Sequence, residues 1–403
     1  MTCPLCQSQN NKKELFIAKN VFISSGKLDK NPTSINNYKH INNIKIGGGG
    51  YCKGNNTITL QQCLECGYIF NSNFNLQEIS KEYQNKGYFS RKIVSKTMSN
   101  TIKIIKNKCL KYIDKNTVCL EIAPGSGDMV NALVNDVNFI YTIDPSLISL
   151  EIDHVKNITH IQGFFDINIL KNKLQHKINF IIFRHLLEHI NTPLDFLHNV
   201  IKLLDNNNLI YIEVPNINEI FKHKRFYEIF NDHCGYYQKN TLINIMQSLG
   251  CHFIDEITLF REQHMGLFFQ KKSNNQIHKK LSFKIFNQNI SIFFQKNIKK
   301  LNDFLKDYEN IAIYGSGAHG NSIVTFLKNP EKIKKCFDLD TRKQGMYLQN
   351  SSIPIQEPNI KNFQNIEIIV IAAPLYEEEI IYSLRNKGYI NHIIATEKEI
   401  KLL

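Results

Sequence analysis

The central part of the chain alternates between short apolar runs and amphipathic stretches. Helical spacing of apolar residues predicts helices at 93–113 and 193–204. The apolar runs between them have the length of buried strands and lie at 118–122, 139–143, 158–161, 178–183 and 209–214. Strands that alternate with helices indicate a parallel, doubly wound sheet. Two further strands, 253–260 and 265–270, are expected to close this sheet after an insertion at 219–250.

A second unit of the same kind is predicted near the C-terminus. The chain from Ile311 to Gly320 gives an apolar strand, a glycine loop and the start of a helix, and strand 366–372 and helix 376–386 follow. The stretch 276–309 between the two units is basic and apolar at helical spacing, which favours a linking helix.

The loop after the first strand has the composition of a cofactor site. Glu121 ends the strand, and Gly125 and Gly127 follow without the G-x-G-x-x-G or the Gly-Lys-Ser/Thr of phosphate-binding loops. Asp144 ends the next strand. Two acids at successive strand ends suit a cationic cofactor with a free ribose, such as S-adenosylmethionine (SAM). An ordinary turn that needs glycine for its dihedral angles is the alternative.

Four of the ten cysteines form two Cys-x-x-Cys pairs, Cys3 with Cys6 and Cys63 with Cys66. Each pair presents two thiolates to one metal, and two pairs complete a tetrahedral structural zinc site. Redox use of the pairs is the alternative, although neither pair opens a helix in a βαβ pattern. The glycine-rich segment around 47–50 is expected to be a loop excursion between the pairs.

Charge and hydropathy narrow the function further. The chain has 49 basic and 36 acidic residues, and its lysines are spread rather than clustered. No basic stripe interleaved with aromatic residues is present, so nucleic acid is not an expected partner, whereas a nucleotide diphosphate fits the excess charge. No apolar run approaches the roughly 18 residues that span a bilayer, and no secretion signal opens the chain. We therefore expect a cytoplasmic protein without disulfides.

Several polar residues follow the other strand ends, where ligands bind in such sheets. Phe165 and Asp166 are placed to flank and hydrogen-bond an adenine. His185 and His189 lie one helical turn apart, so both can face the site. For each histidine, a hydrogen bond to the backbone at a helix start is the alternative.

The insertion contains Asp232 beside His233 in an aromatic loop. An imidazole next to a carboxylate has the composition of a general-base site, because its pKa lies near the working pH. A surface histidine is the alternative interpretation. In the second glycine loop, Gly315, Gly317 and Gly320 fit the dinucleotide fingerprint, which leaves an NAD site as an alternative there.

Jointly, these motifs resemble the three-domain, SAM-dependent C-methyltransferases of nucleotide sugars. The resemblance covers nearly the whole chain and implies an α/β protein with a small N-terminal zinc domain, a central methyltransferase sheet and a C-terminal Rossmann-like domain. The expected segments are a zinc-binding domain at 1–80, a methyltransferase domain at 81–272, a linking helix at 273–309 and a Rossmann-like domain at 310–403. The sequence leaves open whether the protein is a monomer or a dimer.

The resemblance also implies site residues. SAM is expected to bind through the loop and strand ends already described, with Ala123, Pro145 and His185 added. His233 resembles the family base that removes a proton next to a ketone, with Asp232 orienting it and His189 or Tyr88 stabilising the enolate. The residues expected at the nucleotide sugar are Tyr237, His264, His319, Arg342 and Lys343.

The chain departs from the family pattern at three positions. Phe230 replaces a tyrosine, Asp232 a glutamate and His319 a lysine. The expected activity is methyl transfer to a carbon of a nucleotide-linked ketosugar. Methylation of oxygen or nitrogen on a sugar for surface polysaccharide and a non-catalytic zinc- and dinucleotide-binding scaffold are the alternatives.

Overall fold

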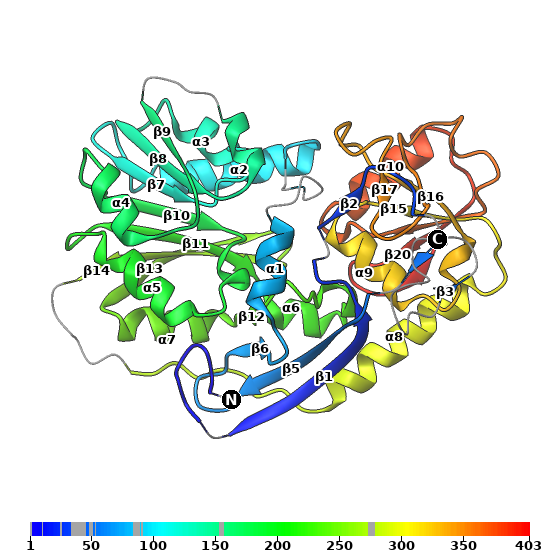
Figure 1. The fold of residues 1–403 in the computed structure, drawn as a ribbon, viewed down its shortest axis with the longest axis horizontal. Helices are drawn as coiled ribbons and strands as arrows, with labels where there is room; N and C mark the ends of the chain where they lie inside the picture. Colours follow the sequence, from blue (N-terminus) through cyan, green and yellow to red (C-terminus); the bar gives the residue numbers. More distant parts are fainter. Residues whose placement is uncertain are drawn as a thin grey trace.

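The computed structural model describes residues 2–403 apart from residues 10, 25, 34–45, 48–50, 53, 84–88, 90, 91, 153–156 and 273–278. The described chain builds three larger sheets (Figure 1). In Figure 1 the central and C-terminal sheets lie on opposite sides of the molecule, and the long strands of the N-terminal sheet run below them. Among the described residues, no helix combines the length and hydropathy needed to cross a membrane.

The central sheet has seven strands in the order β13-β14-β11-β10-β7-β8-β9. Its parallel strands are β7 (Val118–Ile122), β8 (Phe139–Asp144), β9 (Ile158–Gln162), β10 (Phe180–Arg184) and β11 (Leu209–Pro215). The antiparallel edge consists of β14 (His264–Lys271) and β13 (Cys251–Leu259). The strand order reverses at β7, which pairs with both β8 and β10, so the ligand site is expected at the carboxyl end of β7.

Helices cover both faces of this sheet because both faces of its central strands are apolar. On β7, Cys119 joins the core beneath helix α2, whereas Leu120 joins the core beneath helix α5. Ser95 caps α2 by accepting a hydrogen bond from Met98 N, which is why the helix starts later than the sequence pattern predicts. The helices of this region are α1 (Leu76–Tyr83), α2 (Lys96–Cys109), α3 (Asp128–Leu133), α4 (Ile167–Lys173), α5 (Pro193–Lys202), α6 (Ile217–Lys222) and α7 (Lys239–Ser248).

The N-terminal sheet draws on two distant parts of the chain. Its order is β1 (Lys12–Val21), β5 (Asn56–Cys63), β6 (Ile69–Asn71) and β12 (Gly235–Tyr236). Strand β12 belongs to the insertion that also carries His233. The sheet therefore joins the cysteine-bearing segment directly to the insertion.

The C-terminal sheet contains six strands and two flanking helices. The strand order is β18 (Ile355–Gln356), β16 (Ile333–Phe337), β15 (Ile311–Tyr314), β19 (Ile368–Ile371), β20 (His392–Ala395) and β21 (Lys401–Leu402), and the helices are α9 (Ala318–Phe326) and α10 (Glu377–Asn386). Beside this sheet, β2 (Leu28–Asp29) pairs with β17 (Tyr347–Leu348), as Figure 1 shows. The excursion between the cysteine pairs thus reaches the C-terminal domain, and it also contains the short hairpin β3 (Ile46–Gly47) and β4 (Tyr51–Cys52).

The linking helix is shorter than predicted. Helix α8 spans Asn289–Leu305, and residues 279–288 before it are not helical. Two glutamine side chains take the place of helical hydrogen bonds there. Gln238 Oε1 accepts from Lys284 N at 2.8 Å, and Gln62 Oε1 accepts from Phe286 N at 2.9 Å. Because side-chain amides satisfy the backbone, this segment packs as an extended chain on the N-terminal sheet.

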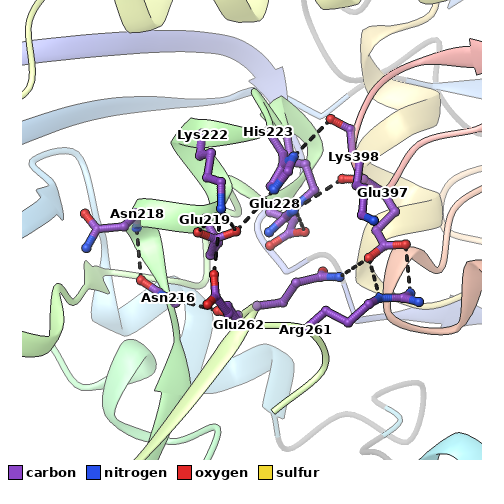
Figure 2. A network of polar contacts seen from close by, with 12 residues as sticks. Asn216, Asn218, Glu219, Lys222, His223, Glu228, Arg261, Glu262, Glu397 and Lys398 are labelled. Carbon is purple, nitrogen blue, oxygen red and sulfur yellow. Dashed lines mark hydrogen bonds and ion pairs between the residues drawn. The ribbon is translucent and has the colours of Figure 1, made fainter. Parts of the chain in front are cut away.

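An ion-paired network joins the central domain to the end of the C-terminal sheet (Figure 2). Arg261 makes a bidentate contact with Glu397, at 2.8 and 2.7 Å. The buried Arg225 binds Glu228 at 2.6 Å and donates to the carbonyl oxygen of Glu397 at 3.2 Å. Tyr227 donates to the carbonyl oxygen of Thr396 at 2.6 Å. The network holds the insertion against the C-terminal domain.

Removing Arg225 tests how much this contact stabilises the fold. Only 1% of the Arg225 side chain and 8% of the Glu228 side chain are exposed, so Arg225→Ala leaves a buried carboxylate without its partner. We expect the free energy of unfolding to fall by about 3–5 kcal/mol, measured by chemical denaturation. Lys299→Ala, which breaks the exposed pair with Asp303, is the control and should leave the denaturation midpoint nearly unchanged. Equal effects of the two substitutions would contradict this role.

Candidate active site

A cavity of about 790 Å³ lies between the carboxyl ends of the central strands and the second glycine loop. Glu121 and Asp144 line it from the central sheet, and Gly315 and His319 line it from the C-terminal domain. Leu28 of strand β2 lines it from the N-terminal excursion. All three larger segments of the chain therefore contribute walls to one cavity.

The first glycine loop positions Asp144. Gly125 N donates to Asp144 Oδ2 at 3.1 Å, and Ser146 N donates to Asp144 Oδ1 at 2.7 Å. Ala123 and Gly125 both have positive φ, 56° and 57°, which curls the loop toward the strand end. Pro145 also lines the cavity. The loop after β7 thus holds the Asp144 carboxylate, at the end of β8, next to its own backbone.

Gly127 does not line the cavity. It caps helix α3 with φ 80°, and a side chain there would meet Ile152 Cγ1 at 2.8 Å. Gly127 therefore has a structural role, and its cofactor contact stays a prediction. The glycine is needed because the left-handed backbone and the close neighbour both exclude a Cβ atom.

Burial dominates the chemistry of the two acids. It raises the pKa of Glu121 to about 8, although the guanidinium of Arg184 opposes the shift. Burial also raises the pKa of Asp144, against the hydrogen bonds from Ser146 and Gly125. Both carboxyl groups are costly to ionise in the cavity, so a cationic ligand would restore their charge.

Of the two residues expected beside the adenine, Phe165 and Asp166, the first lines the cavity. Phe165 lines the cavity and packs edge-on against Phe196, with ring centroids 5.2 Å apart. Asp166 instead caps helix α4, where its Oδ1 accepts from Asn168 N at 2.7 Å. An N-cap acid satisfies backbone donors at the helix start, which occupies Oδ1 of Asp166. A contact of Asp166 with adenine stays a prediction.

A charged cluster occupies the ends of β10, β11 and β14. Arg184 Nε binds Glu213 Oε2 at 2.5 Å, and His185 Nε2 lies 2.9 Å from Glu213 Oε1. His264 packs against His185 with ring centroids 4.7 Å apart. Burial opposes ionisation of Glu213, but Arg184 and His185 outweigh it and hold the pKa of that carboxyl well below its usual range. Both histidines line the cavity.

A second pair of histidines, His189 and His233, lines the part of the cavity next to the insertion. His189 and His233 meet edge to face with ring centroids 4.6 Å apart. His189 Nδ1 lies 2.8 Å from the carbonyl oxygen of Asp232 and must donate to it. Its Nε2 therefore carries the lone pair while the ring is neutral. Burial lowers the pKa of His189, and burial together with the neighbouring His189 lowers the pKa of His233 well below its usual range.

Asp232 also contacts His189, because the Nδ1 of His189 donates a hydrogen bond to the main-chain carbonyl oxygen of Asp232. Orientation of His233 by the Asp232 carboxylate stays a prediction. Tyr88 lies outside the described residues, so its proposed place beside the reacting carbon also stays a prediction.

Phe230 separates His233 from the C-terminal domain. Its ring packs against His233 at 4.8 Å and against His319 at 5.3 Å. Tyr227 lies on the far side of His319, at 5.9 Å. Phe230 therefore connects His319 of the second glycine loop to His233 of the insertion. Sequence spacing alone contains no signal for it.

The other residues expected at the sugar nucleotide differ in their position relative to the cavity. Lys343 lines the cavity and lies 3.4 Å from Asp338, which also accepts from Ser316 Oγ at 2.6 Å. Arg342 is ion-paired with Asp340 at 2.7 Å. Tyr237 is fully buried away from the cavity and donates to the carbonyl oxygen of Leu187 at 3.4 Å. Its ring and hydroxyl are enclosed by protein, and a contact of Tyr237 with the sugar nucleotide stays a prediction.

The four paired cysteines converge at the N-terminus. Cys3 and Cys66 lie 3.7 Å apart between sulfur atoms, and so do Cys6 and Cys63. All four sulfur atoms lie within 4.8 Å of one another. Four thiolates around a zinc ion at about 2.3 Å would be about 3.8 Å apart, so the cluster has the dimensions of such a site.

Two family models match the regions that form the cavity. The model described as a methyltransferase domain matches residues 95–256, and the one described as a C-methyltransferase C-terminal domain matches residues 258–391. Fold and matched model together define the central part of the chain as a class I methyltransferase domain. With the second model, the chain matches the C-methyltransferase family.

Individual relatives are distant. The chain is 23% identical over 218 residues to the C-methyltransferase NovU of Streptomyces niveus, a match that covers 49% of this chain and 52% of NovU. It therefore spans about half the length of that relative. Among solved structures, the N-methyltransferase NodS of Bradyrhizobium japonicum is 12% identical, with a TM-score of 0.33 over 43% of this chain and 98% of NodS. The magnesium protoporphyrin IX methyltransferase of Synechocystis is also 12% identical, with a TM-score of 0.34 over 48% and 92%.

The raised pKa of Glu121 predicts a pH-dependent stability. The folded pKa, about 8, exceeds the ordinary value of 4.5, so the stabilising contribution is complete below pH 4.5 and is lost as the pH rises through about 8. Glu121→Gln stays neutral throughout. The stability advantage of the wild type over this variant should shrink by roughly 1 kcal/mol per pH unit within that window. Denaturation midpoints at pH 5, 6.5 and 8 measure it, and parallel profiles would disprove the shift.

Proposed function

We propose that the protein transfers a methyl group from SAM to a carbon of a nucleotide-linked ketosugar. The observation that carries the proposal is the pair His189 and His233, held in a cavity shared by the strand-end acids and the second glycine loop. A carbon acceptor must lose a proton before it is methylated, and an unprotonated imidazole is the group to take it. Family membership supports the carbon acceptor.

The residues at the carboxyl ends of β7 and β8 fit SAM by their chemistry. Asp144 offers a buried carboxylate for ribose hydroxyls, and Glu121 offers a second acid for a cationic tail. Phe165 supplies an apolar surface for the adenine. When bound, SAM supplies an electrophilic methyl group; the chain supplies position and exclusion of water.

His233 would act as the base. Because burial lowers its pKa, the imidazole is neutral at pH 7 and can accept a proton from the carbon next to the ketone. His189 cannot donate to the resulting enolate from Nε2 while it is neutral, since its proton is on Nδ1. The proposal therefore assigns the stabilising hydrogen bond to Tyr88.

The nucleotide would lie toward the C-terminal domain. Lys343 and His319 line that end of the cavity and can meet diphosphate oxygens, in keeping with the net basic charge of the chain. Phe230 favours a second candidate, methylation of oxygen or nitrogen on a sugar, because no phenol stands there to stabilise an enolate. Those acceptors need no carbon-bound proton to leave.

We also propose that Cys3, Cys6, Cys63 and Cys66 hold one structural zinc ion. Elemental analysis of freshly purified protein should give about one equivalent per chain. Replacing Cys6 with serine should remove the metal and destabilise the N-terminal sheet, whereas Cys336→Ser, at a buried cysteine distant from the cluster, should keep it. Less than half an equivalent in unchelated wild-type protein would remove this assignment.

The base is tested by hydrogen exchange. Incubated in D2O with a keto-sugar nucleotide and S-adenosylhomocysteine, which fills the cofactor site without a methyl group, the enzyme should introduce deuterium next to the ketone. His233→Gln should slow this exchange at least about a hundredfold, as expected when a general base is lost. Both proteins should bind S-adenosylhomocysteine equally in calorimetry.

The product distinguishes the two candidates. A C–CH3 signal in the NMR spectrum of the methylated sugar supports the carbon acceptor. An O–CH3 or N–CH3 signal, formed without carbon-bound proton exchange, would transfer the assignment to the second candidate.

A further inference from the structure

Glu188, His189 and His233 place a carboxylate and two imidazoles around one point in the cavity. One ligand atom from each residue lies within 4.8 Å of the other two. We propose that these three residues form a binding site for a divalent transition-metal cation, and that the bound cation competes with the proton-transfer role of His233. The second clause rests on the proposed function, whereas the first does not.

The dimensions of the cluster are close to those of a metal site. Zinc lies about 2.1 Å from imidazole nitrogen and carboxylate oxygen. Three donors 4.8 Å apart would each have to move by about 0.7 Å to reach that distance from their common centre. Shifts of this size need only side-chain adjustment. Two imidazoles with one carboxylate favour zinc, cobalt or nickel over magnesium, which prefers oxygen ligands.

The surroundings of His189 match those of a metal-bound histidine. Its Nδ1 donates to the carbonyl oxygen of Asp232 at 2.8 Å, which fixes the ring and leaves the Nε2 lone pair for a ligand. Histidines that bind metals usually donate their other ring nitrogen to a carbonyl or carboxylate in this way. The tautomer that rules out donation to an enolate is the tautomer that a cation requires.

His233 supplies an independent observation. Its Nδ1 is buried, and no atom of the described residues is its hydrogen-bond partner. A buried polar nitrogen without a partner costs free energy that a ligand in the cavity would recover.

A neighbouring cluster of the same composition is less suited to a cation. His185, Glu213 and His264 also lie within 4.8 Å of one another. There, however, the Glu213 carboxylate already binds the guanidinium of Arg184 at 2.5 Å. The permanent charge of Arg184 neutralises the acid and repels a second cation. The ion pair of Glu188 is longer: its Oε1 lies 3.9 Å from His185 Nδ1, whose charge is not permanent, and only 2% of the Glu188 side chain is exposed, so burial makes its charge costly.

Cobalt is the probe. Zinc-loaded protein titrated with Co²⁺ should bind one further equivalent in calorimetry, with the visible spectrum of nitrogen and oxygen ligation rather than thiolate ligation. Glu188→Gln and His233→Gln should each weaken this equivalent at least about tenfold. The control His198→Gln removes an exposed histidine on α5 and should bind Co²⁺ as the wild type does. All variants should retain their zinc and their thermal melting temperature.

Competition between the bound cation and proton transfer by His233 is measured separately. Deuterium exchange into the keto-sugar nucleotide should fall in proportion to Co²⁺ occupancy and recover when the added Co²⁺ is chelated. No further equivalent in the wild type, or an unchanged equivalent in both site variants, overturns the metal site. Binding as expected by a protein that exchanges no proton even without Co²⁺ leaves the metal site standing and rejects the proposed base.

Discussion

The structure depends on one constraint: two sheets must present their ligand-binding edges to the same cavity. The contact between Arg261 and Glu397, with Arg225 beneath it, fixes that relation. The turn that carries Arg261 has positive φ at three successive residues, 260–262, none of them glycine. Such a backbone is unfavourable for residues with a side chain and persists only where its surroundings hold it. The bidentate ion pair of Arg261 and the hydrogen bond from Asn216 Nδ2 to the carbonyl oxygen of Glu262, at 3.1 Å, both hold it.

Burial at the carboxyl ends of the central strands determines the electrostatics of the cavity. Arg184 is committed to Glu213, which leaves Glu121 and Asp144 as carboxyl groups whose burial outweighs their partners. Burial also lowers the pKa of His189 and of His233. The cavity therefore combines acids that burial makes costly to ionise with imidazoles that burial keeps neutral. A ligand that brings positive charge to the acids and an acidic C–H bond to the imidazoles would complement both.

The sequence predicts the parts of the structure that are encoded locally. The five parallel strands follow from apolar runs, each of which needs no distant partner to be recognised. The extended segment before α8 and strand β12 were missed because their hydrogen-bond partners, Gln62 and strand β6, lie far away in sequence. Asp166 and Gly127 both cap helices. The same residue types occur in helix caps and in cofactor loops, so the sequence motif alone does not separate the two roles. The proximity of Phe230 to His319 depends on domain packing and has no sequence signal.

The pairing of β2 with β17 has a consequence for synthesis of the chain. Leu28 leaves the ribosome long before Leu348, with which it pairs. Asn321 and Asn350 add further hydrogen bonds to the same early segment. Closing so long a loop is slow, because the entropy of the intervening chain is lost before the contact forms. A segment made early relative to its partner is thus completed late, and the wall of the cavity that contains Leu28 exists only after β17 has been made.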